Sequence, residues 1–363
     1  MPPRVCILAS QYFAWGKYGG FGSMSRKLAT SLAAAGVQVE VIVPRRGGQR
    51  PVEVVDGVTV FSFDPLRLDE AWRLLRASGA EVFHSQDPTV VTWLAQRAQP
   101  RRAHLVSCVD PRDQRDWWVE FRYASLRRRL LTPLNYLTES GLLVRRAVQR
   151  ADAVYCPAHF LVEKVTRLFQ PRGGVAYLPY LIDAPPSAPP KHGPPSLAFV
   201  ARWDRRKRPE VFLDLARRFP SCRFVAVGEG EDRRYDEALR RSHADVANLE
   251  MPGFVDRFGG ESLSALLARS WILVNTAARE GLPLTFLEAA AQGCAILSAV
   301  DPDGFASRFG EHVVGDDFAA ALERLLADDP IEKGREAHRY VLADCETSLA
   351  LKAHLDEYER HAG

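Results

Sequence analysis

The chain has 363 residues, of which 48 are Lys or Arg and 45 are Asp or Glu, so its formal net charge is +3. Hydrophobic residues make up 47% and charged residues 26%, a composition that excludes a disordered, collagen-like or coiled-coil chain. The nearly balanced charge argues against a protein that coats nucleic acid. The length predicts two domains, which we expect at 1–185 and 186–340, followed by a C-terminal helix in 341–363.

The net charge is divided unevenly along the chain. Residues 1–185 carry 25 basic and 16 acidic side chains, whereas residues 186–363 carry 23 basic and 29 acidic ones. This split indicates either that the first half meets an anionic partner or that it has Arg-rich solvated faces, and both interpretations stay open.

The cysteines and the apolar runs bear on the cellular location. The six cysteines are widely spaced and show no zinc or redox spacing, which predicts buried, reduced thiols in a reducing compartment. The apolar run 5–9 is too short for a signal peptide, and no stretch approaches the ~18 apolar residues of a membrane span. We therefore expect a cytoplasmic protein, with peripheral contact at the inner face of the membrane as an alternative.

Residues 184–196 contain six prolines and predict a stiff, extended linker. The first half opens with a β-α-β pattern: a strand at 5–10, a loop with Gly16, Gly19, Gly20 and Gly22, a helix at about 23–35 and a strand at 39–43. The second half continues with strands at 197–200, 224–227, 271–275 and 295–298, helices at 209–219, 284–292 and 317–327, and a helical segment at 332–360. This alternation predicts an α/β fold with two Rossmann-like parallel-sheet domains and ligands at the carboxyl ends of the strands, in a cleft between the domains.

The segment 279–293 follows a predicted strand and carries two acids. Glu280 precedes Gly281 in the loop, the first helical turn offers free N–H groups that suit a diphosphate, and Glu288 can accept hydrogen bonds from two ribose hydroxyls. By spacing alone, both acids are equally well explained as charges that flank a helix.

The segment 201–209 concentrates cations at the end of another predicted strand. A basic run at a helix N-terminus opposes the helix dipole and favours a nearby anion, so the loop is a candidate phosphate site. The alternative is a solvated basic loop. The cations are Arg202, Arg205, Arg206, Lys207 and Arg208.

These two segments, together with 225–231 and 248–256, resemble the retaining glycosyltransferases of family 4, which have the GT-B fold. The resemblance rests on a Glu-x7-Glu element at Glu280 and Glu288 and an Arg-x4-Lys element at Arg202 and Lys207. The first half matches more loosely, through the glycine loop and the segments 81–87, 151–160 and 178–183.

The resemblance implies that an N-terminal domain binds the acceptor, a C-terminal domain binds a nucleotide-sugar, most simply a UDP- or GDP-sugar, and the terminal helix packs back on the first domain. Sugar transfer would proceed with retention on the front face, without a cofactor or an essential metal. Asp301 and Asp303 are more typical of a turn than of a metal site. The implied catalytic residues are Arg202, Lys207 and Glu280, and the implied donor-binding residues are Gly20, Gly22, Gly228, Val255, Gly281, Leu282, Pro283, Leu284 and Glu288.

The first half also departs from the family. Where many members have a His just before an Asp or Gly at the end of the fourth strand, this chain has 107–110, Ser-Cys-Val-Asp. The usual contact to a hydroxyl of the donor sugar is therefore missing or remade, which leaves the donor sugar open.

Residues 110–150 interleave Arg with aromatic side chains, a pattern that favours an element that binds an acceptor or a membrane surface. The alternative is an insertion packed on its own Trp and Leu residues.

His84 follows a predicted strand. A His near a sheet end is more often structural than catalytic, although it can line a cleft. The candidate acceptor-binding residues are His84, Asp110, Arg112 and Arg115.

Taken together, the sequence predicts a glycosyltransferase that acts on a glycan, glycolipid or other envelope or polysaccharide acceptor. A nucleotide-sugar epimerase or hydrolase of the same fold, and a non-catalytic nucleotide-sugar-binding protein, remain alternatives. A dehydrogenase is disfavoured because no complete G-x-G-x-x-G follows a strand.

Overall fold

The computed structural model describes residues 2–15, 19–124, 126–256 and 262–362. The chain divides into two compact units: the first comprises 1–117, 126–181 and 347–363, and the second comprises 118–125 and 182–346. Where the sequence predicts a boundary at 185/186, the chain leaves the first unit after Leu181, and it returns to it at Thr347 rather than at 341.

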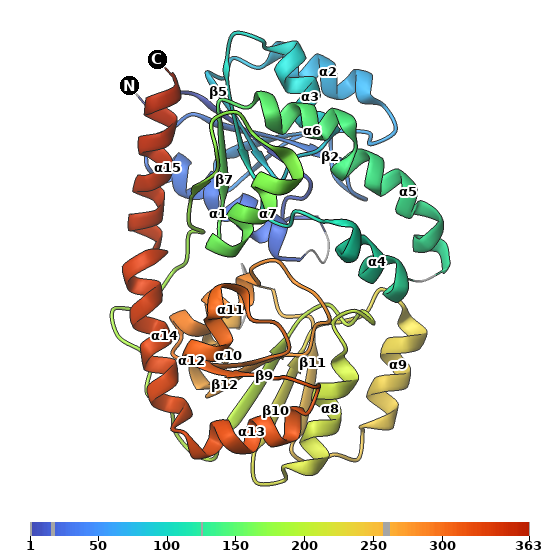
Figure 1. The fold of residues 1–363 in the computed structure, drawn as a ribbon, viewed down its shortest axis with the longest axis vertical. Helices are drawn as coiled ribbons and strands as arrows, with labels where there is room; N and C mark the ends of the chain where they lie inside the picture. Colours follow the sequence, from blue (N-terminus) through green and yellow to red (C-terminus); the bar gives the residue numbers. More distant parts are fainter. Residues whose placement is uncertain (1, 16–18, 125, 257–261, 363) are drawn as a thin grey trace. The chain divides into compact units, whose positions relative to one another are not determined.

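The first unit is built on an eight-stranded sheet in the order β3-β4-β2-β1-β5-β6-β7-β8, of which β2, β5 and β7 are labelled in Figure 1. All neighbouring strands run parallel except the β3–β4 pair. The predicted parallel α/β architecture is thus confirmed for this half. The strands are β1 (Val5–Ala9), β2 (Val39–Pro44), β3 (Val52–Val55), β4 (Val58–Phe63), β5 (Val82–Gln86), β6 (Ala103–Ser107), β7 (Ala153–Cys156) and β8 (Ala176–Tyr177).

Alternate residues of the central strand β1 enter two different cores. Val5 and Ile7 belong to the core that also holds Leu28 of α1 and Tyr358 of α15. Cys6 and Leu8 belong to the core on the opposite face, with residues of α2 and α3. Because both faces of a parallel sheet are covered by helices, its strands consist almost entirely of apolar residues.

One helix of the first unit begins earlier in the chain than the sequence predicts. Helix α1 begins at Gly20, not near Ser23, so Gly20 and Gly22 lie in its first turn rather than in a loop. Gly16 lies outside the described residues. The helices are α1 (Gly20–Ala34), α2 (Leu68–Ala77), α3 (Val90–Ala98), α4 (Gln114–Tyr123, which crosses into the second unit at Trp118), α5 (Leu126–Ser140), α6 (Leu142–Arg150), α7 (His159–Phe169) and α15 (Thr347–Ala362).

The second unit contains a six-stranded, entirely parallel sheet in the order β11-β10-β9-β12-β13-β14. Phe199 and Leu297 of its strands share a core with Phe212 of α8 and Phe318 of α13. The elements are β9 (Ser196–Val200), α8 (Pro209–Arg218), β10 (Arg223–Val227), α9 (Arg233–Ser242), β11 (Leu249–Gly253), α10 (Leu263–Arg269), β12 (Ile272–Asn275), α11 (Leu284–Ala291), β13 (Ala295–Ser298), the short helix η1 (Pro302–Gly304), α12 (Phe305–Phe309), β14 (Gly310–His312), α13 (Phe318–Ala327) and α14 (Pro330–Asp344).

The predicted helical segment 332–360 is two helices, α14 and α15, and not one. They are separated at Cys345 and Glu346, where the Cys345 carbonyl accepts a hydrogen bond from the Ile182 N–H at 2.9 Å and Glu346 forms a β-bridge with Ile182. The Cys345 backbone has left the helical region, with φ of −133° and ψ of 14°, so the helix is interrupted at that point.

The proline-rich segment 184–196 is anchored to the second unit. The Lys191 ammonium donates to the carbonyl oxygens of Leu267 at 3.2 Å, Ala268 at 3.0 Å and Gln292 at 2.7 Å. These carbonyls lie at the C-terminal ends of α10 and α11, where a cation is favoured. The six cysteines are free and buried, as the spacing predicts.

Candidate functional site

Two loops of the second unit lie at the same edge of its sheet. One follows β9 and contains the basic run, and the other follows β12, which is the neighbour of β9. The Ala278 N–H donates to the Arg206 carbonyl at 2.9 Å. The hydroxyl of Thr276, a fully buried residue, lies 2.6 Å from the Lys207 carbonyl and 2.8 Å from the Arg208 carbonyl. The two predicted donor-site segments are therefore tied together through the backbone.

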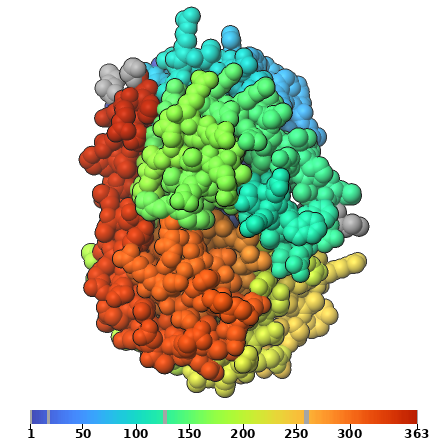
Figure 2. Space-filling view, in the orientation of Figure 1, coloured from blue at the N-terminus to red at the C-terminus, as the bar shows by residue number. Residues whose placement is uncertain are grey.

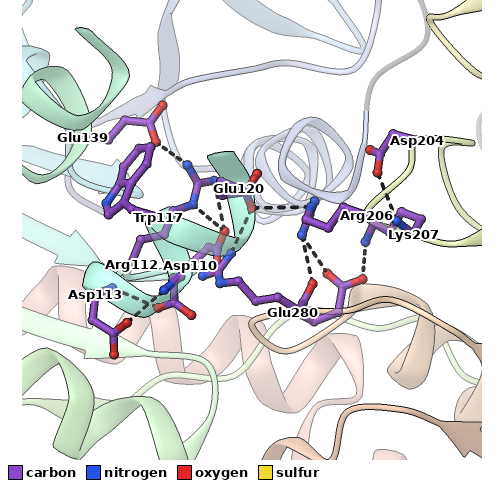
Figure 3. A network of polar contacts seen from close by, with 12 residues as sticks. Asp110, Arg112, Asp113, Trp117, Glu120, Glu139, Asp204, Arg206, Lys207 and Glu280 are labelled. Carbon is purple, nitrogen blue, oxygen red and sulfur yellow. Dashed lines mark hydrogen bonds and ion pairs between the residues drawn. The ribbon is translucent and has the colours of Figure 1, made fainter. Parts of the chain in front are cut away.

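Lys207 and Glu280, both predicted to be catalytic, form an ion pair between these loops (Figure 3). Both side chains are largely buried, with exposed fractions of 18% and 11%. Arg206 also approaches Glu280, with Nη1 4.0 Å from Oε2, and donates from the same nitrogen to the Arg279 carbonyl at 2.9 Å. The geometry therefore holds two cations at one carboxylate at the carboxyl end of the sheet.

Arg202, the third predicted catalytic residue, is paired differently. Its guanidinium lies 3.4 Å from Glu231 and 3.7 Å from Asp204, and 40% of its side chain is exposed. Asp204 Oδ1 also accepts a hydrogen bond from the Lys207 N–H at 3.1 Å. The Asp204 carboxylate thus links the Arg202 guanidinium to the Lys207 N–H, while Arg202 also approaches Glu231, which follows β10.

Glu120 is an acid that the sequence did not indicate. It pairs with two cations, Arg206 and Arg279, which with Lys207 form the cation cluster of this site. It belongs to residues 118–125, which cluster with the second unit. Its Oε1 lies 3.4 Å from Arg206 Nε and 3.4 Å from Arg279 Nη1 (Figure 3). Because the partners are far apart in sequence, no local pattern could have indicated this contact.

Helix α11 begins at the edge of the cation cluster. Pro283 precedes it, no side chain caps its N-terminus and its first turn holds no acid. The Phe286 N–H donates to the Pro283 carbonyl at 3.0 Å, so the N–H groups of Leu284 and Thr285 are the ones available to an anion. Glu288 lies one turn further on and is half-buried; Pro283 is buried, and Gly281, Leu282 and Leu284 are half-buried. The structure thus places the predicted donor residues 280–284 and Glu288 along one loop and helix.

Gly228 and Val255 lie at the ends of the adjoining strands. Gly228 has φ of 129°, and a Cβ there would lie 1.8 Å from the Ala201 carbonyl oxygen. The loop after β11 is fixed because the Phe254 N–H donates to Glu229 Oε1 at 3.2 Å, and Val255 is half-buried beside it. Gly228 therefore allows the β9 loop to approach β10, which is a packing role.

Two of the predicted acceptor residues, Asp110 and Arg112, contact each other in the first unit (Figure 3). Arg112 donates to Asp110 at 3.1 Å and to Glu139 at 2.7 Å, and its guanidinium lies 5.1 Å from the Trp117 ring. Arg115 is exposed. Arg112 therefore joins the residues after β6 to helix α5.

Asp87, at the end of β5, is a second residue that the sequence did not single out. It has φ of 77°, and its Oδ1 accepts from the Val109 N–H at 3.3 Å. Burial and the nearby Asp110 carboxylate raise the pKa of Asp87 to about 7, although the Arg112 charge acts in the opposite direction. An acid at a strand end was the only local signal available.

His84 is part of the core rather than of an accessible surface. It is fully buried, with Nδ1 2.7 Å from the Tyr358 hydroxyl and Nε2 2.8 Å from Ser107 Oγ. Burial holds the pKa of the imidazole well below its usual value, with His354 adding to the effect. Contrary to the predicted acceptor role, His84 has no exposed surface to offer a ligand, and it fits the structural alternative.

Within the described ranges, no group of three or more His, Cys, Asp or Glu side chains could hold a metal ion. Asp301 instead accepts hydrogen bonds from the N–H groups of Ala306 at 2.7 Å and Ser307 at 3.1 Å, so it stabilises a turn. The independence from metal stays a prediction.

The fold and this site together describe an α/β protein of two parallel-sheet units, with a basic loop beside an uncapped helix start in the second unit. Residues 19–180 match the family described as Glycosyl transferase 4-like domain, and residues 183–340 match the family described as Glycosyl transferases group 1. The chain therefore belongs to the glycosyltransferases with these two domains, and its fold is GT-B, as the sequence predicted.

Solved structures agree with this fold. Sucrose-phosphate synthase from Thermosynechococcus elongatus is 17% identical, with a TM-score of 0.73 over 99% of this chain and 98% of that one. Anabaena HepE in complex with UDP-glucose is 13% identical, with a TM-score of 0.67 over 98% of both chains. The catalytic domain of Arabidopsis thaliana starch synthase IV, bound to ADP and acarbose, is 12% identical, with a TM-score of 0.67 over 100% of both chains. No curated protein matches the chain at a significant level.

Proposed function

We propose that this glycosyltransferase moves a sugar from a nucleoside diphosphate sugar to a glycan, a glycolipid or another envelope or polysaccharide acceptor, with retention of configuration. The observation that supports it best is the ion pair between Lys207 and Glu280, held where the β9 loop meets the uncapped start of α11. A basic loop beside a free helix N-terminus suits a diphosphate leaving group.

In this proposal, catalysis is the stabilisation of charge as the sugar–phosphate bond breaks. Lys207, Arg202 and the first N–H groups of α11 would neutralise the departing diphosphate, and interactions that strengthen in the transition state raise the rate. Glu280 orients Lys207 and would contact the sugar, and Glu288 would bind the ribose hydroxyls. Front-face retention needs no protein nucleophile, because the acceptor hydroxyl attacks from the side on which the diphosphate leaves, and the departing phosphate can accept the proton of that hydroxyl.

The donor is proposed to be a UDP- or GDP-sugar. HepE was solved with UDP-glucose and starch synthase IV with ADP, so ADP belongs in the same comparison. Thermal unfolding of the full chain should be compared with UDP, GDP, ADP and dTDP, since a ligand at 100 times its dissociation constant stabilises a protein by about 2.7 kcal/mol. Stabilisation by none of these compounds, at any soluble concentration, would contradict the proposal.

Incubation with the matching nucleotide-sugar separates transfer from the alternatives. A transferase should turn over slowly with donor alone and quickly once glycan or lipid-linked acceptors are added, with the anomeric configuration of the product read by NMR. An isomerised sugar without acceptor would show an epimerase, free sugar at an acceptor-independent rate would show a hydrolase, and an inverted product would exclude retention.

The acceptor is proposed to contact the first unit near Asp110, Arg112 and Arg115. Asp87 extends this set, because it lies at the carboxyl end of β5, where open parallel sheets bind ligands. No cofactor is proposed. Replacement of Arg115 by Gln should raise the KM for the acceptor with little change in the KM for the donor.

A further inference from the structure

Helix α5 presents a stripe of leucines to solvent. Leu130, Leu134 and Leu137 have exposed fractions of 78%, 55% and 60%, and Leu131 is 46% exposed. The spacing of four and three residues places the first three on one side of the helix, with Leu131 at the border. We name these four residues the α5 surface.

The opposite side of α5 makes the contacts with the rest of the first unit. The Tyr136 ring lies 5.8 Å from the Trp117 ring, and Glu139 accepts a hydrogen bond from Arg112 at 2.7 Å. Helix α5 packs chiefly against α6, and it lies at the periphery of the unit (Figure 1). In Figure 2, the segment forms part of the visible face. The leucines are therefore exposed because of how the helix is docked.

The charge of this segment identifies the kind of partner. Residues 126–150 contain six arginines, no lysine and a single acid, Glu139. Arg145, Arg146 and Arg150 are exposed on α6. A second copy of the chain would bring two such basic segments together, whereas an anionic surface complements both the arginines and the leucines.

We propose that the α5 surface docks on an anionic membrane, with its leucines at the boundary between headgroups and acyl chains and the neighbouring arginines at lipid phosphates. An amphipathic helix with Leu on one face and Arg beside it lies in the plane of the interface. No helix in the described part of the chain is long and apolar enough to cross a bilayer. This inference goes beyond the proposed sugar transfer, because it fixes where the enzyme works and not what it transfers.

The test is flotation of the full-length protein with vesicles of phosphatidylcholine alone and of equal parts phosphatidylcholine and phosphatidylglycerol. We expect binding to the mixed vesicles at low salt and at least about tenfold weaker binding to the neutral ones. The variant L130Q/L134Q/L137Q should bind the mixed vesicles at least about tenfold more weakly than the unchanged protein.

A matched control replaces three other exposed apolar residues of the first unit. Val54, Leu66 and Leu68 have exposed fractions of 69%, 90% and 44%, and V54Q/L66Q/L68Q should bind within about twofold of the unchanged protein. Thermal unfolding, and its shift by the nucleotide that binds best, should be the same in all three proteins, so loss of vesicle binding is read separately from loss of the donor site.

Three results would overturn the proposal. The first is equal flotation of the α5 variant and the control, and the second is no flotation of the unchanged protein at low salt. The third is a dimer in sedimentation velocity that the α5 substitutions convert to a monomer while neither protein floats, which would make the surface an interface between copies.

Discussion

The hydroxyl of Thr276 lies 2.6 Å from the carbonyl oxygen of Lys207, so a fully buried side chain fixes the backbone of the residue proposed to meet the leaving group. Replacement by Val keeps the shape and removes the donor, leaving two carbonyls without this partner. We expect T276V to lose about 1–3 kcal/mol in the free energy of unfolding and to lower kcat more than it raises the donor KM.

The control is T276S, which keeps the hydroxyl. It should retain most of the activity, because its remaining defect is one missing methyl group. Urea unfolding and steady-state kinetics measure both effects, and a T276V enzyme as stable and as active as T276S would show that the hydrogen bonds do not position the loop.

The ion pair between Lys207 and Glu280 predicts that loss of the Lys207 charge lowers turnover more than it lowers the stability of the fold. K207M removes a cation proposed to stabilise the departing diphosphate, and we expect kcat to fall about 100-fold or more. An exposed cation of the same run, Arg205, which packs over the Tyr235 ring at 4.5 Å, serves as the control in R205M. Similar kcat values in the two variants would assign Lys207 a purely structural role.

The buried carboxyl of Asp87 predicts that the difference in stability between D87N and the unchanged protein depends on pH. The pKa of its carboxyl is raised from 3.8 to about 7 by burial and by Asp110, so the folded state binds more protons than the unfolded state between these values, and its stability falls as pH rises through them. D87N removes this dependence, and Asn tolerates the left-handed backbone. We expect the stability of D87N relative to the unchanged protein to increase by up to about 3 kcal/mol from pH 5 to pH 8.

The measurement is urea unfolding at both pH values. D328N, at an exposed site, should show the same difference from the unchanged protein at pH 5 and pH 8. A pH-independent difference for D87N as well would mean that the Asp87 carboxyl titrates normally.

Gly228 predicts a steric effect, since a Cβ at this position would lie 1.8 Å from the Ala201 carbonyl oxygen and φ is 129°. G228A should cost more than about 3 kcal/mol or abolish soluble expression. Gly315 also has positive φ, 74°, but nothing lies within 4 Å of its Cβ position, so G315A should cost only about 1 kcal/mol. Equal costs in urea unfolding would refute the close approach of the β9 loop.

The sequence predicted those features whose signals are local. Strand β13 was predicted with its observed bounds, because Gly293 ends the preceding helix and the strand itself is apolar. The start of α1 at Gly20 was missed, because glycine has a low helix propensity that the surrounding structure overrides. The break at Cys345 depends on pairing with Ile182, a contact that no local pattern reveals.

The same distinction holds for the candidate site. The positions of Lys207, Glu280 and the start of α11 after strands could be predicted from local patterns, whereas the catalytic roles of Lys207 and Glu280 follow from the resemblance and stay predictions. Glu120, Thr276 and Asp87 could not, since each acquires its part in the site through partners that are distant in sequence. Burial of His84 likewise follows from Tyr358, which lies 274 positions away.

Helix α15 also affects the order in which the two units can complete their folding during synthesis. Tyr358 and Ala350 are part of the core formed by β1 and α1, so the first unit lacks a wall of its core until residues 347–362 have left the ribosome. The main stretch of the second unit, 182–346, emerges before them and can fold as one continuous piece. The half that is translated first is therefore the half that is completed last, and its apolar surface needs protection throughout synthesis.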